Sequence, residues 1–472
     1  MTLPDPVRQW AEARPDAPAL AGAAEWSWAE LDARVGAAAD GLRRGPERVA
    51  VRSETSPELV VLVLAALRAR RLLVPLSTRW TPAAVSDALR RLGVGRLLTD
   101  DPAGLDVPTA PLSSAVPGPL ADATAGRTPA GPAPDLDGGR PWTVVHTSGS
   151  TGRPKAVVHT VDNHVWSARG VNEHLALRAG DRWLLDLPLY HVGGLGVVVR
   201  CALAGATVAV PAPGTADPVA ALRPTHASLV ATQLGRLLDA GADLSGLRAV
   251  LLGGSAVPAD LLARALGERV PVSVSYGMTE ATATVTATDP GSGDGTSGRP
   301  LPHRRVRVTD AGEVEVGGPT VAAVLDGAEA RPLGPWFATG DLGRLDAAGR
   351  LTVTGRADLQ FVSGGENVRP EAIEAALAAL AAVAEAVVVP VPDAEWGARP
   401  VAWVRAASGA AAPDGAALAA ALRETLPGFM VPAAFHAWAG AGGMKPDRPA
   451  LTREAERRAA AGGGAASAGG LG

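Results

Sequence analysis

Strand-like apolar runs alternate with helical patterns over the first hundred residues of this 472-residue sequence, and again after residue 180. In the first stretch, helices are predicted at 28–42 (with Ser27 as N-cap), at 57–68 and from Thr81-Pro82 onward, and strands at 49–52 and 72–76. In the second stretch, strands are predicted at 183–187, 206–210, 249–252 and 272–275, and helices at 227–240 and 259–266. This alternation is typical of layered α/β folds with largely parallel strand pairing.

The pattern changes between residues 306 and 353, where short alternating runs are separated by Gly and Asp turns. Such runs predict a small antiparallel barrel or sheet. A helix at 370–382 and strands at 386–389 and 401–404 then predict a compact α+β domain. The expected fold is α/β: a large N-terminal domain at 1–356, made of layered α/β subdomains plus a small β-barrel; a small α+β C-terminal domain at 357–458; and a disordered tail at 459–472.

The composition limits the partners and the compartment. With 47% hydrophobic residues and a net charge of -4, the chain can build sizeable cores and gives no electrostatic reason to expect nucleic acid or an anionic membrane surface. The single cysteine, Cys201, lies in an apolar run, which predicts a core residue and fits a reducing cytosol. We expect neither a signal peptide nor stable membrane insertion, because the most apolar segment, 59–67, is too short to span a bilayer. A cytoplasmic protein is expected.

A loop rich in hydroxyls and glycines follows the apolar run 142–145, with the sequence His-Thr-Ser-Gly-Ser-Thr-Gly-Arg-Pro-Lys at 146–155. Glycines allow close backbone approach, successive amides and hydroxyls form an anion site, and lysine supplies a compact charge for phosphate. It is not a Walker A motif, because Pro154 precedes the lysine and Ala156 follows it. The loop predicts a polyphosphate site for ATP, formed by Thr147, Ser148, Gly149, Ser150, Thr151, Gly152 and Lys155. A Ser/Gly surface turn is the alternative.

Five further segments combine glycine with catalytic residue types. In Tyr276–Glu280, a carboxylate at the end of an apolar strand is placed to hold the Mg²⁺ that accompanies ATP. Asp341, on a tight turn, suits the hydroxyls of a ribose, and Gly355–Asp358 offers a guanidinium and a carboxylate at the domain junction. The segments 363–367 and 442–445 are Gly-Gly loops, the second ending in Lys445. Taken singly, each also fits an ordinary structural turn.

In this order and spacing, the segments resemble those of the acyl-adenylate-forming superfamily, which contains acyl- and aryl-CoA ligases, peptide-synthetase adenylation domains and luciferases. The resemblance covers the chain from about Trp26 to Leu451. Within the superfamily, several runs are similar to the o-succinylbenzoate–CoA ligases of menaquinone synthesis: 187–194, 225–234, 250–256, 336–339, 363–367 and 442–448. The resemblance implies two half-reactions. A carboxylate attacks the α-phosphate of ATP to give an acyl-adenylate and pyrophosphate, and the thiol of coenzyme A then displaces AMP.

The resemblance also assigns roles to residues of the large domain. The loop 147–155 would hold the β- and γ-phosphates, Thr279 would lie near the α-phosphate, and Glu280 would bind Mg²⁺. Asp341 would grip the ribose hydroxyls and Arg356 would contact ribose or phosphate. The adenine would be flanked by Gly254, Ser255, Ser275, Tyr276 and Gly277.

In the C-terminal domain, the resemblance makes Lys445 the catalytic residue of adenylation, because it would bridge the carboxylate and the α-phosphate where transition-state charge concentrates. The domain is then expected to be mobile, with Asp358 as its hinge. Gly364 and Gly365 would swing in to form the channel for the pantetheine of coenzyme A.

The acyl pocket should contain a cation or a cluster of hydrogen-bond donors if the acid carries a second carboxylate. Arg200 is the candidate, because it follows the apolar stretch 195–199. A snorkelling or salt-bridged arginine is the alternative. Ser228, Thr232 and His191 are further candidates, and His191 could equally be a packed core histidine.

Three other functions stay open: another aryl- or fatty-acyl-CoA ligase, a stand-alone adenylation enzyme that loads a carrier protein, and a non-catalytic nucleotide-binding protein on the same fold. A homodimer is also open.

Overall fold

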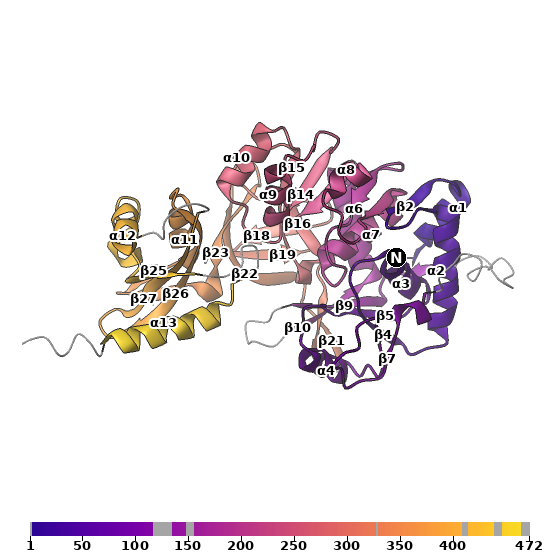
Figure 1. Ribbon diagram of the computed structural model, residues 1–472, viewed down its shortest axis with the longest axis horizontal. Coiled ribbons are helices and arrows are strands. Elements are labelled where there is room, and N and C mark those ends of the chain that lie inside the picture. Colours follow the sequence, from indigo (N-terminus) through magenta and orange to yellow (C-terminus); the bar gives the residue numbers. More distant parts are fainter. Residues whose placement is uncertain are drawn as a thin grey trace, which may run out of the picture. The chain divides into compact units, whose positions relative to one another are not determined.

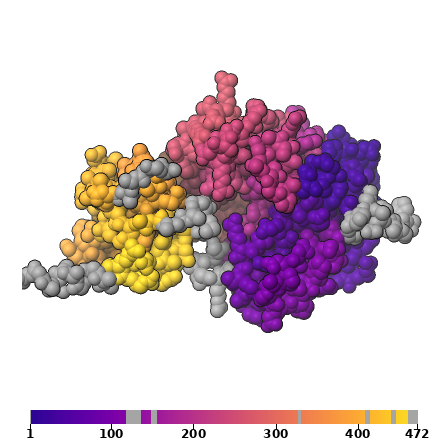
Figure 2. Space-filling model, viewed as in Figure 1, coloured from indigo at the N-terminus to yellow at the C-terminus, as the bar shows by residue number. Residues whose placement is uncertain are grey.

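The computed structural model describes residues 2–116, 135–147, 155–326, 329–407, 414–438 and 446–463 (Figure 1). The chain divides into two compact units. Unit 1 comprises Met1–Arg307, Glu315–Phe337 and Asp346–Leu351. Unit 2 comprises Val308–Val314, Ala338–Leu345 and Thr352–Gly472. In Figure 2, the indigo and purple N-terminal segments and the pink segments of unit 1 form one continuous body.

Two large mixed sheets form the frame of unit 1. One has the strand order β17-β16-β15-β14-β13-β11-β12-β2-β3, and the other β21-β20-β10-β9-β5-β4-β6-β7. The strands of the first are β2 (Pro18–Gly22), β3 (Trp26–Ser27), β11 (Arg182–Leu184), β12 (Thr207–Val210), β13 (His226–Leu229), β14 (Ala249–Leu252), β15 (Val272–Met278), β16 (Ala283–Ala287) and β17 (Arg299–Pro300). Those of the second are β4 (Arg48–Arg52), β5 (Leu72–Pro75), β6 (Leu97–Thr99), β7 (Thr109–Ala110), β9 (Pro141–Thr147), β10 (Lys155–Thr160), β20 (Ala323–Asp326) and β21 (Glu329–Pro332). The central pairs, such as β4 with β5 and β14 with β15, are parallel, as predicted.

Helices of unit 1 begin where the sequence supplies caps. Ser27 caps α2 through a capping box with Glu30, Ser56 caps α3, and Thr81 caps α4. The helices are α1 (Pro6–Ala13), α2 (Trp28–Arg43), α3 (Pro57–Arg68), α4 (Pro82–Arg91), α6 (Val161–His174), α7 (Val192–Ala204), α8 (Pro218–Leu222), α9 (Ala231–Asp239) and α10 (Ala259–Gly267). Short pieces are β1 (Thr2–Leu3), β8 (Leu136–Asp137), η1 (Leu112–Ser114) and η2 (Thr279–Ala281). No helix among the described residues is long and apolar enough to cross a membrane.

Alternate residues of each sheet enter different cores, because successive strand side chains point to opposite faces. On β14, Ala249 and Leu251 join a core with α2, α3, α6 and α7, whereas Val250 and Leu252 join a core with α8, α9 and α10. On β9, Val145 joins the first of these cores and Val144 packs with α4. Unit 1 is therefore layered as helix, sheet, helices, sheet, helices, and its largest core lies between the two sheets.

Unit 2 contains a three-stranded sheet in the order β26-β27-β28, with helices packed on it. Its elements are η3 (Ala357–Leu359), β24 (Phe361–Ser363), β25 (Glu366–Val368), α11 (Pro370–Ala378), β26 (Val383–Asp393), β27 (Gly397–Ala406), α12 (Gly415–Arg423), η4 (Gly428–Met430), β28 (Ala434–Ala437) and α13 (Arg448–Gly463). A four-stranded sheet has the order β18-β19-β22-β23, with β18 (Arg305–Val308), β19 (Glu313–Gly317), β22 (Trp336–Leu345) and β23 (Leu351–Arg356). The predicted sheet at 306–353 is present, while its closure into a barrel and the domain boundary at 356 stay predictions.

The structure differs from the sequence-based expectations at three places. Residues 226–229 form strand β13, where a helix from 227 was predicted, because all four are buried between neighbouring parallel strands. Strands β20 and β21 lie within the range 306–353 predicted to form a small sheet, but they pair next to β10 and extend its sheet. Helix α13 continues to Gly463, although disorder was predicted from 459, because alanine has a high helix propensity.

Candidate active site

The predicted phosphate loop connects two antiparallel strands of unit 1. Lys155, the exposed first residue of β10, pairs with the half-buried Thr147 at the end of β9. The residues between them, with Ser148, Gly149, Ser150, Thr151 and Gly152, lie outside the described residues. The hairpin geometry therefore places both ends of the loop, with one hydroxyl and one ammonium group, at the same point of the sheet edge.

The residues predicted to flank adenine meet at the carboxyl ends of two adjacent parallel strands. Leu252 of β14 pairs with Val274 of β15, and the Ser275 hydroxyl donates to the Leu252 carbonyl oxygen over 3.1 Å. Gly254 (φ +88°) and the exposed Ser255 follow β14 directly. The neighbouring strand carries Tyr276 and Gly277.

Gly277 is sterically required. A Cβ atom at this position would lie 1.8 Å from the carbonyl oxygen of Ala283 on β16, so any side chain would force the two strands apart. The glycine therefore sets the close approach of β15 and β16 immediately before Thr279 and Glu280.

A short 3-10 turn, η2, presents Thr279 and Glu280, both half-buried. Three partners hold its backbone. The His159 Nε2 atom lies 2.8 Å from the Thr279 carbonyl oxygen, the Ala322 amide donates to the Glu280 carbonyl oxygen over 2.9 Å, and the Ser167 hydroxyl donates to the Thr282 carbonyl oxygen over 2.5 Å. Thr282 has φ +53°, a left-handed conformation that a β-branched residue adopts only when its surroundings impose it.

Buried polar residues behind this turn were not predicted from the sequence. His159, on β10, also contacts the Thr143 hydroxyl, which contacts His164 on α6. All three are at most 2% exposed. Burial lowers the pKa of His159 to about 4, and burial followed by the neighbouring His159 lowers the pKa of His164 well below its usual value. The available signal was a pair of histidines, five residues apart, one in a mostly apolar strand and one in the first turns of the helix after it.

Arg200 lies on α7 in the core of unit 1 and is 1% exposed. Its guanidinium is 5.0 Å from the Trp183 ring centroid, and its Nη2 atom donates to the Thr284 hydroxyl at the long distance of 3.5 Å. Within the described residues, its Nε and Nη1 atoms have no hydrogen-bond partner. Burial lowers its pKa to about 10, and Arg304, whose own pKa is lowered to about 9 by burial and then by Arg200, adds a second cation nearby. A buried, under-bonded guanidinium is suited to receive an anion.

Trp183 connects two of the predicted acyl-site residues. Its indole Nε1 donates to the Ser228 hydroxyl over 3.1 Å, and its ring contacts Arg200 as well as the stacked His226 ring at 5.2 Å. The structure therefore brings Ser228 and Arg200 together through a tryptophan that the sequence analysis did not single out.

The other two predicted acyl-site residues are not joined to this group by any described contact. Thr232 lies in the first turn of α9 and is half-buried. His191 is the exposed N-cap of α7, packed edge-on against Tyr190 at 4.7 Å, so it is not a core residue. Partial desolvation and then the Arg79 guanidinium lower its pKa.

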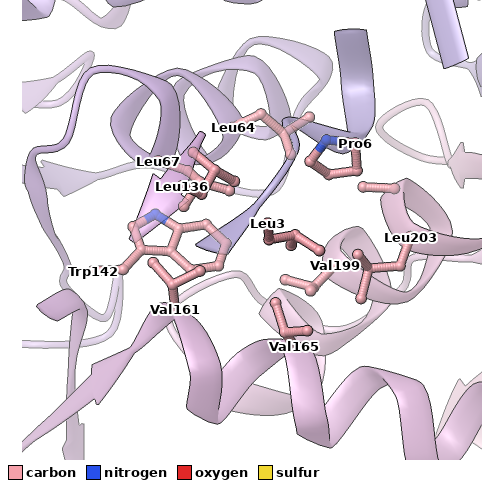
Figure 3. Close-up of a pocket in the computed structure, with 11 residues that line it drawn as sticks. Leu3, Pro6, Leu64, Leu67, Leu136, Trp142, Val161, Val165, Val199 and Leu203 are labelled. Atoms are coloured by element: carbon pink, nitrogen blue, oxygen red, sulfur yellow. The ribbon is translucent and has the colours of Figure 1, made fainter. Parts of the chain in front are cut away.

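Cys201, beside Arg200, is fully buried in the core of unit 1, as predicted. Burial raises the pKa of its thiol, which therefore stays protonated. A cavity elsewhere in this core is lined by apolar groups such as Leu3, Leu64, Trp142 and Val165 (Figure 3). Its volume is about 10 Å³, about that of a single water site, so it is a packing gap and not a substrate pocket.

In unit 2, Arg356 bridges two carboxylates. Its Nη1 atom donates to Asp341 over 3.0 Å, and its Nε and Nη2 atoms donate to Asp358 over 2.9 and 3.0 Å. The hydrogen bonds to Asp358 raise the pKa of Arg356 above its already high value. The Glu371 carboxylate accepts from the Arg356 amide over 3.0 Å, and burial raises the pKa of Glu371. The predicted ribose, phosphate and hinge residues thus form one ion-pair cluster.

The predicted coenzyme A loop is a tight hairpin between β24 and β25. Gly364 (φ +59°) and Gly365 (φ +85°) occupy its two turn positions, both of which require positive φ. A Cβ atom on Gly364 would lie 2.5 Å from the Trp396 ring, so the hairpin tip sits directly against this tryptophan.

Lys445 lies outside the described residues, but the segment that follows it is anchored. Arg448, at the start of α13, donates to the Val388 carbonyl oxygen over 2.7 Å and forms an ion pair with Glu374 at 2.8 Å.

Comparisons with known proteins agree with this arrangement. Residues 7–324 match the family described as AMP-binding enzyme, and residues 372–440 match the AMP-binding enzyme C-terminal domain. The 2-succinylbenzoate–CoA ligase of Salmonella typhimurium is 36% identical over 420 residues, which cover 86% of this chain and 88% of that protein.

Two solved structures of the o-succinylbenzoate coenzyme A synthetase from Bacillus subtilis are also similar. The complex with the acyl-adenylate intermediate has a TM-score of 0.85 at 27% identity, covering 96% of this chain and 98% of that one. The complex with ATP and magnesium ion has a TM-score of 0.82 at 28% identity, covering 93% and 96%. The chain therefore belongs to the AMP-binding enzyme family, and within that family it is similar to the 2-succinylbenzoate–CoA ligases over most of its length.

Proposed function

We propose that this chain is an ATP-dependent, AMP-forming 2-succinylbenzoate–CoA ligase. It converts o-succinylbenzoate into o-succinylbenzoyl-CoA through an acyl-adenylate, in menaquinone (vitamin K2) biosynthesis. The choice of acid rests on Arg200, a buried guanidinium with under-bonded nitrogens. It lies against Trp183, whose indole donates a hydrogen bond to Ser228. A diacid can place its non-reacting carboxylate there, whereas a fatty acid or a monocarboxylic aryl acid would leave the charge uncompensated. The relatives named 2-succinylbenzoate–CoA ligase support the same choice.

The first half-reaction brings a carboxylate toward a polyanion, so the protein contributes mainly positioning and charge neutralisation. Thr147 to Lys155 hold the β- and γ-phosphates as the leaving group. Thr279 contacts the α-phosphate, and the ends of β14 and β15 flank the adenine. Thr232 and His191 are further candidates for lining the acyl site.

Glu280 holds the Mg²⁺ that enters with ATP. The described residues contain no group of three or more His, Cys, Asp or Glu side chains that could bind a metal alone. A single carboxylate nevertheless fits Mg²⁺, which usually keeps one or two protein carboxylates and completes its shell with phosphate oxygens and water. When bound, the metal neutralises phosphate charge.

Unit 2 supplies the ribose contact, the lysine for adenylation and the loop for thioester formation. Asp341 accepts the ribose hydroxyls, with Arg356 beside it. Lys445 bridges the attacking carboxylate and the α-phosphate. After adenylation the C-terminal part turns about Asp358, so that Gly364 and Gly365 form the channel in which the thiol of coenzyme A reaches the acyl-adenylate. We place the enzyme in the cytoplasm.

The test is a pyrophosphate-release assay with a panel of acids. The control is an analogue whose non-reacting carboxylate is a methyl ester. We expect kcat/KM for o-succinylbenzoate to be about a hundredfold higher than for this ester, corresponding to about 3 kcal/mol for a hydrogen-bonded charge. A preferred fatty or simple aryl acid would point to another CoA ligase, and failure of free coenzyme A as acceptor would point to a carrier-loading enzyme.

Arg200→Leu sharpens the test, because function and stability should change in opposite directions. The KM for the diacid should rise about a hundredfold, while the ester is no longer disfavoured. The free energy of unfolding should increase, since the lowered pKa of Arg200, about 10, corresponds to a burial cost of about 3 kcal/mol. An unchanged KM for o-succinylbenzoate would refute the assignment of the pocket.

A further inference from the structure

Three buried side chains form an ordered chain of hydrogen bonds that ends on the backbone of the η2 turn. The His159 Nε2 atom is 2.8 Å from the Thr279 carbonyl oxygen, and its Nδ1 atom is 3.4 Å from the Thr143 hydroxyl. The same hydroxyl is 2.9 Å from Nε2 of His164. A carbonyl oxygen can only accept, so His159 must carry its proton on Nε2, and its Nδ1 must then accept from Thr143.

The remaining contact fits the same order of donors. Once the Thr143 hydroxyl donates to His159, it accepts from Nε2 of His164. Each neutral imidazole has one N–H group, and each is used once. The lowered pKa values of both histidines agree with neutral rings. The chain of bonds therefore has one direction, from α6 through β9 and β10 to the η2 turn.

The bond to Thr279 fixes the peptide plane between the two residues assigned to the reaction. Glu280 follows that peptide directly in the η2 turn, so the orientation of this peptide sets the direction in which the Glu280 side chain leaves the backbone. The turn also carries two consecutive left-handed residues, Thr282 (φ +53°) and Ala283 (φ +75°). Such a conformation persists only where surrounding contacts hold it.

We infer that His159 is a positioning residue for adenylation: through its Nε2–H bond it holds the Thr279–Glu280 peptide in the orientation that presents the Glu280 carboxylate to Mg²⁺ and the Thr279 side chain to the α-phosphate. Thr143 and His164 set the tautomer that makes this bond available. The inference rests on the roles proposed above for Thr279 and Glu280.

Two polar variants separate positioning from folding. His159→Gln places an amide N–H near the position of Nε2, whereas His159→Asn is too short to reach the Thr279 carbonyl oxygen. Both put an amide in the same buried site. His159→Leu removes all polar contacts. The matched control is His174→Leu, which breaks an equivalent 3.0 Å bond from a histidine Nε2 atom to the carbonyl oxygen of Thr288.

ATP binding is measured by calorimetry with Mg²⁺ and with EDTA. We expect Mg²⁺ to increase the ATP affinity of His159→Asn and His159→Leu at least tenfold less than it does for the wild type. The affinity measured in EDTA should fall by a smaller factor, through the Thr279 contact. Acid-dependent pyrophosphate release should fall by the same factor or more in kcat, with little change in KM for the acid. His159→Gln should recover most of both effects, and His174→Leu should match the wild type.

Two outcomes would overturn the inference. Wild-type Mg²⁺ dependence in His159→Asn would show that the bond is not needed. Equal losses in the Gln and Asn variants, tracking an equal fall in Tm, would show a purely structural histidine. Glu280→Gln separates the two proposals. If this variant keeps the full gain in ATP affinity from Mg²⁺, Glu280 does not bind the metal. If it loses that gain while His159→Asn keeps it, Glu280 binds the metal but His159 does not position it.

Discussion

The turn that carries Thr279 and Glu280 in unit 1 is held by neutral hydrogen bonds in a dry interior, whereas the cluster around Asp341 in unit 2 is held by charges. His159 is fully buried. In unit 2 the side chains of Arg356 and Asp358 are 42% and 44% exposed. The two candidate groups of residues are thus held by different kinds of interaction.

The difference predicts which part can rearrange. Buried neutral hydrogen bonds are costly to break without replacement and respond little to salt. Exposed ion pairs contribute little stability and exchange partners with water, salt or a ligand. The fixed geometry belongs to the part that presents Glu280 and Thr279, and the exchangeable one belongs to the part that includes the predicted hinge, Asp358.

The largest expected effect comes from Lys445 in unit 2. Lys445→Ala should reduce acid-dependent pyrophosphate release by about 10²- to 10³-fold, as for loss of one donor in a comparable electrostatic site. Transfer of the acyl group from supplied acyl-adenylate to coenzyme A should be retained. Equal loss of both half-reactions would contradict a lysine that serves adenylation only.

Asp341→Asn tests the charged cluster directly. Loss of the carboxylate should raise KM for ATP about ten- to hundredfold, since hydrogen bonds to charged groups contribute about 1.5–3 kcal/mol. The matched control is Asp346→Asn, which breaks the 2.7 Å ion pair between Asp346 and Arg350. If both variants change KM for ATP alike, the ribose role of Asp341 is wrong.

Acidification should weaken the hydrogen-bonded interior of unit 1. Burial lowers the pKa of His146 and of His159 to about 4, below the unfolded value near 6.5. Because the folded state binds fewer protons, this stability is complete above pH 6.5 and is lost as pH falls toward 4, by up to about 3 kcal/mol for each group. Urea unfolding at pH 7 and pH 5 measures the loss, and the double variant His146→Asn, His159→Gln should reduce it, while buried His164 keeps part of the pH dependence.

The smallest expected effect is the difference in stability between alanine variants of the two glycines in the β24–β25 hairpin. Gly364→Ala should cost about 1 kcal/mol more than Gly365→Ala and slow the coenzyme A step by several fold, because only Gly364 meets Trp396. Both positions have positive φ, so the backbone penalty is shared. Equal effects would show that contact with Trp396 is unimportant. Thermal unfolding and single-turnover thioester formation are the measurements.

Local signals in the sequence were enough for most of the fold. Ser27, Ser56-Pro57 and Thr81-Pro82 mark helix starts that the structure reproduces. Prediction failed where tertiary context decides. Residues 226–229 have the apolar content of a helix or a strand, and only burial between β11 and β14 selects the strand.

Candidate site residues could be named from the sequence where a motif carries them and not where packing does. Asp341, Arg356 and Asp358 lie in short Gly-containing motifs, and the structure joins them. Their pairing could not be foreseen, because it depends on how β22 and β23 meet. His159 and Trp183 look like ordinary core residues in sequence, and only their buried hydrogen bonds distinguish them.

Trp183 also provides an optical probe of the proposed acyl site. Its indole lies 5.0 Å from the Arg200 guanidinium, in surroundings that exclude water, so the field of that cation acts on its excited state with little screening. An acid whose second carboxylate neutralises Arg200 would shift the emission of this tryptophan, whereas ATP alone would not. A difference spectrum between the wild type and Trp183→Phe would then report occupancy by the acid in real time, before any bond is formed.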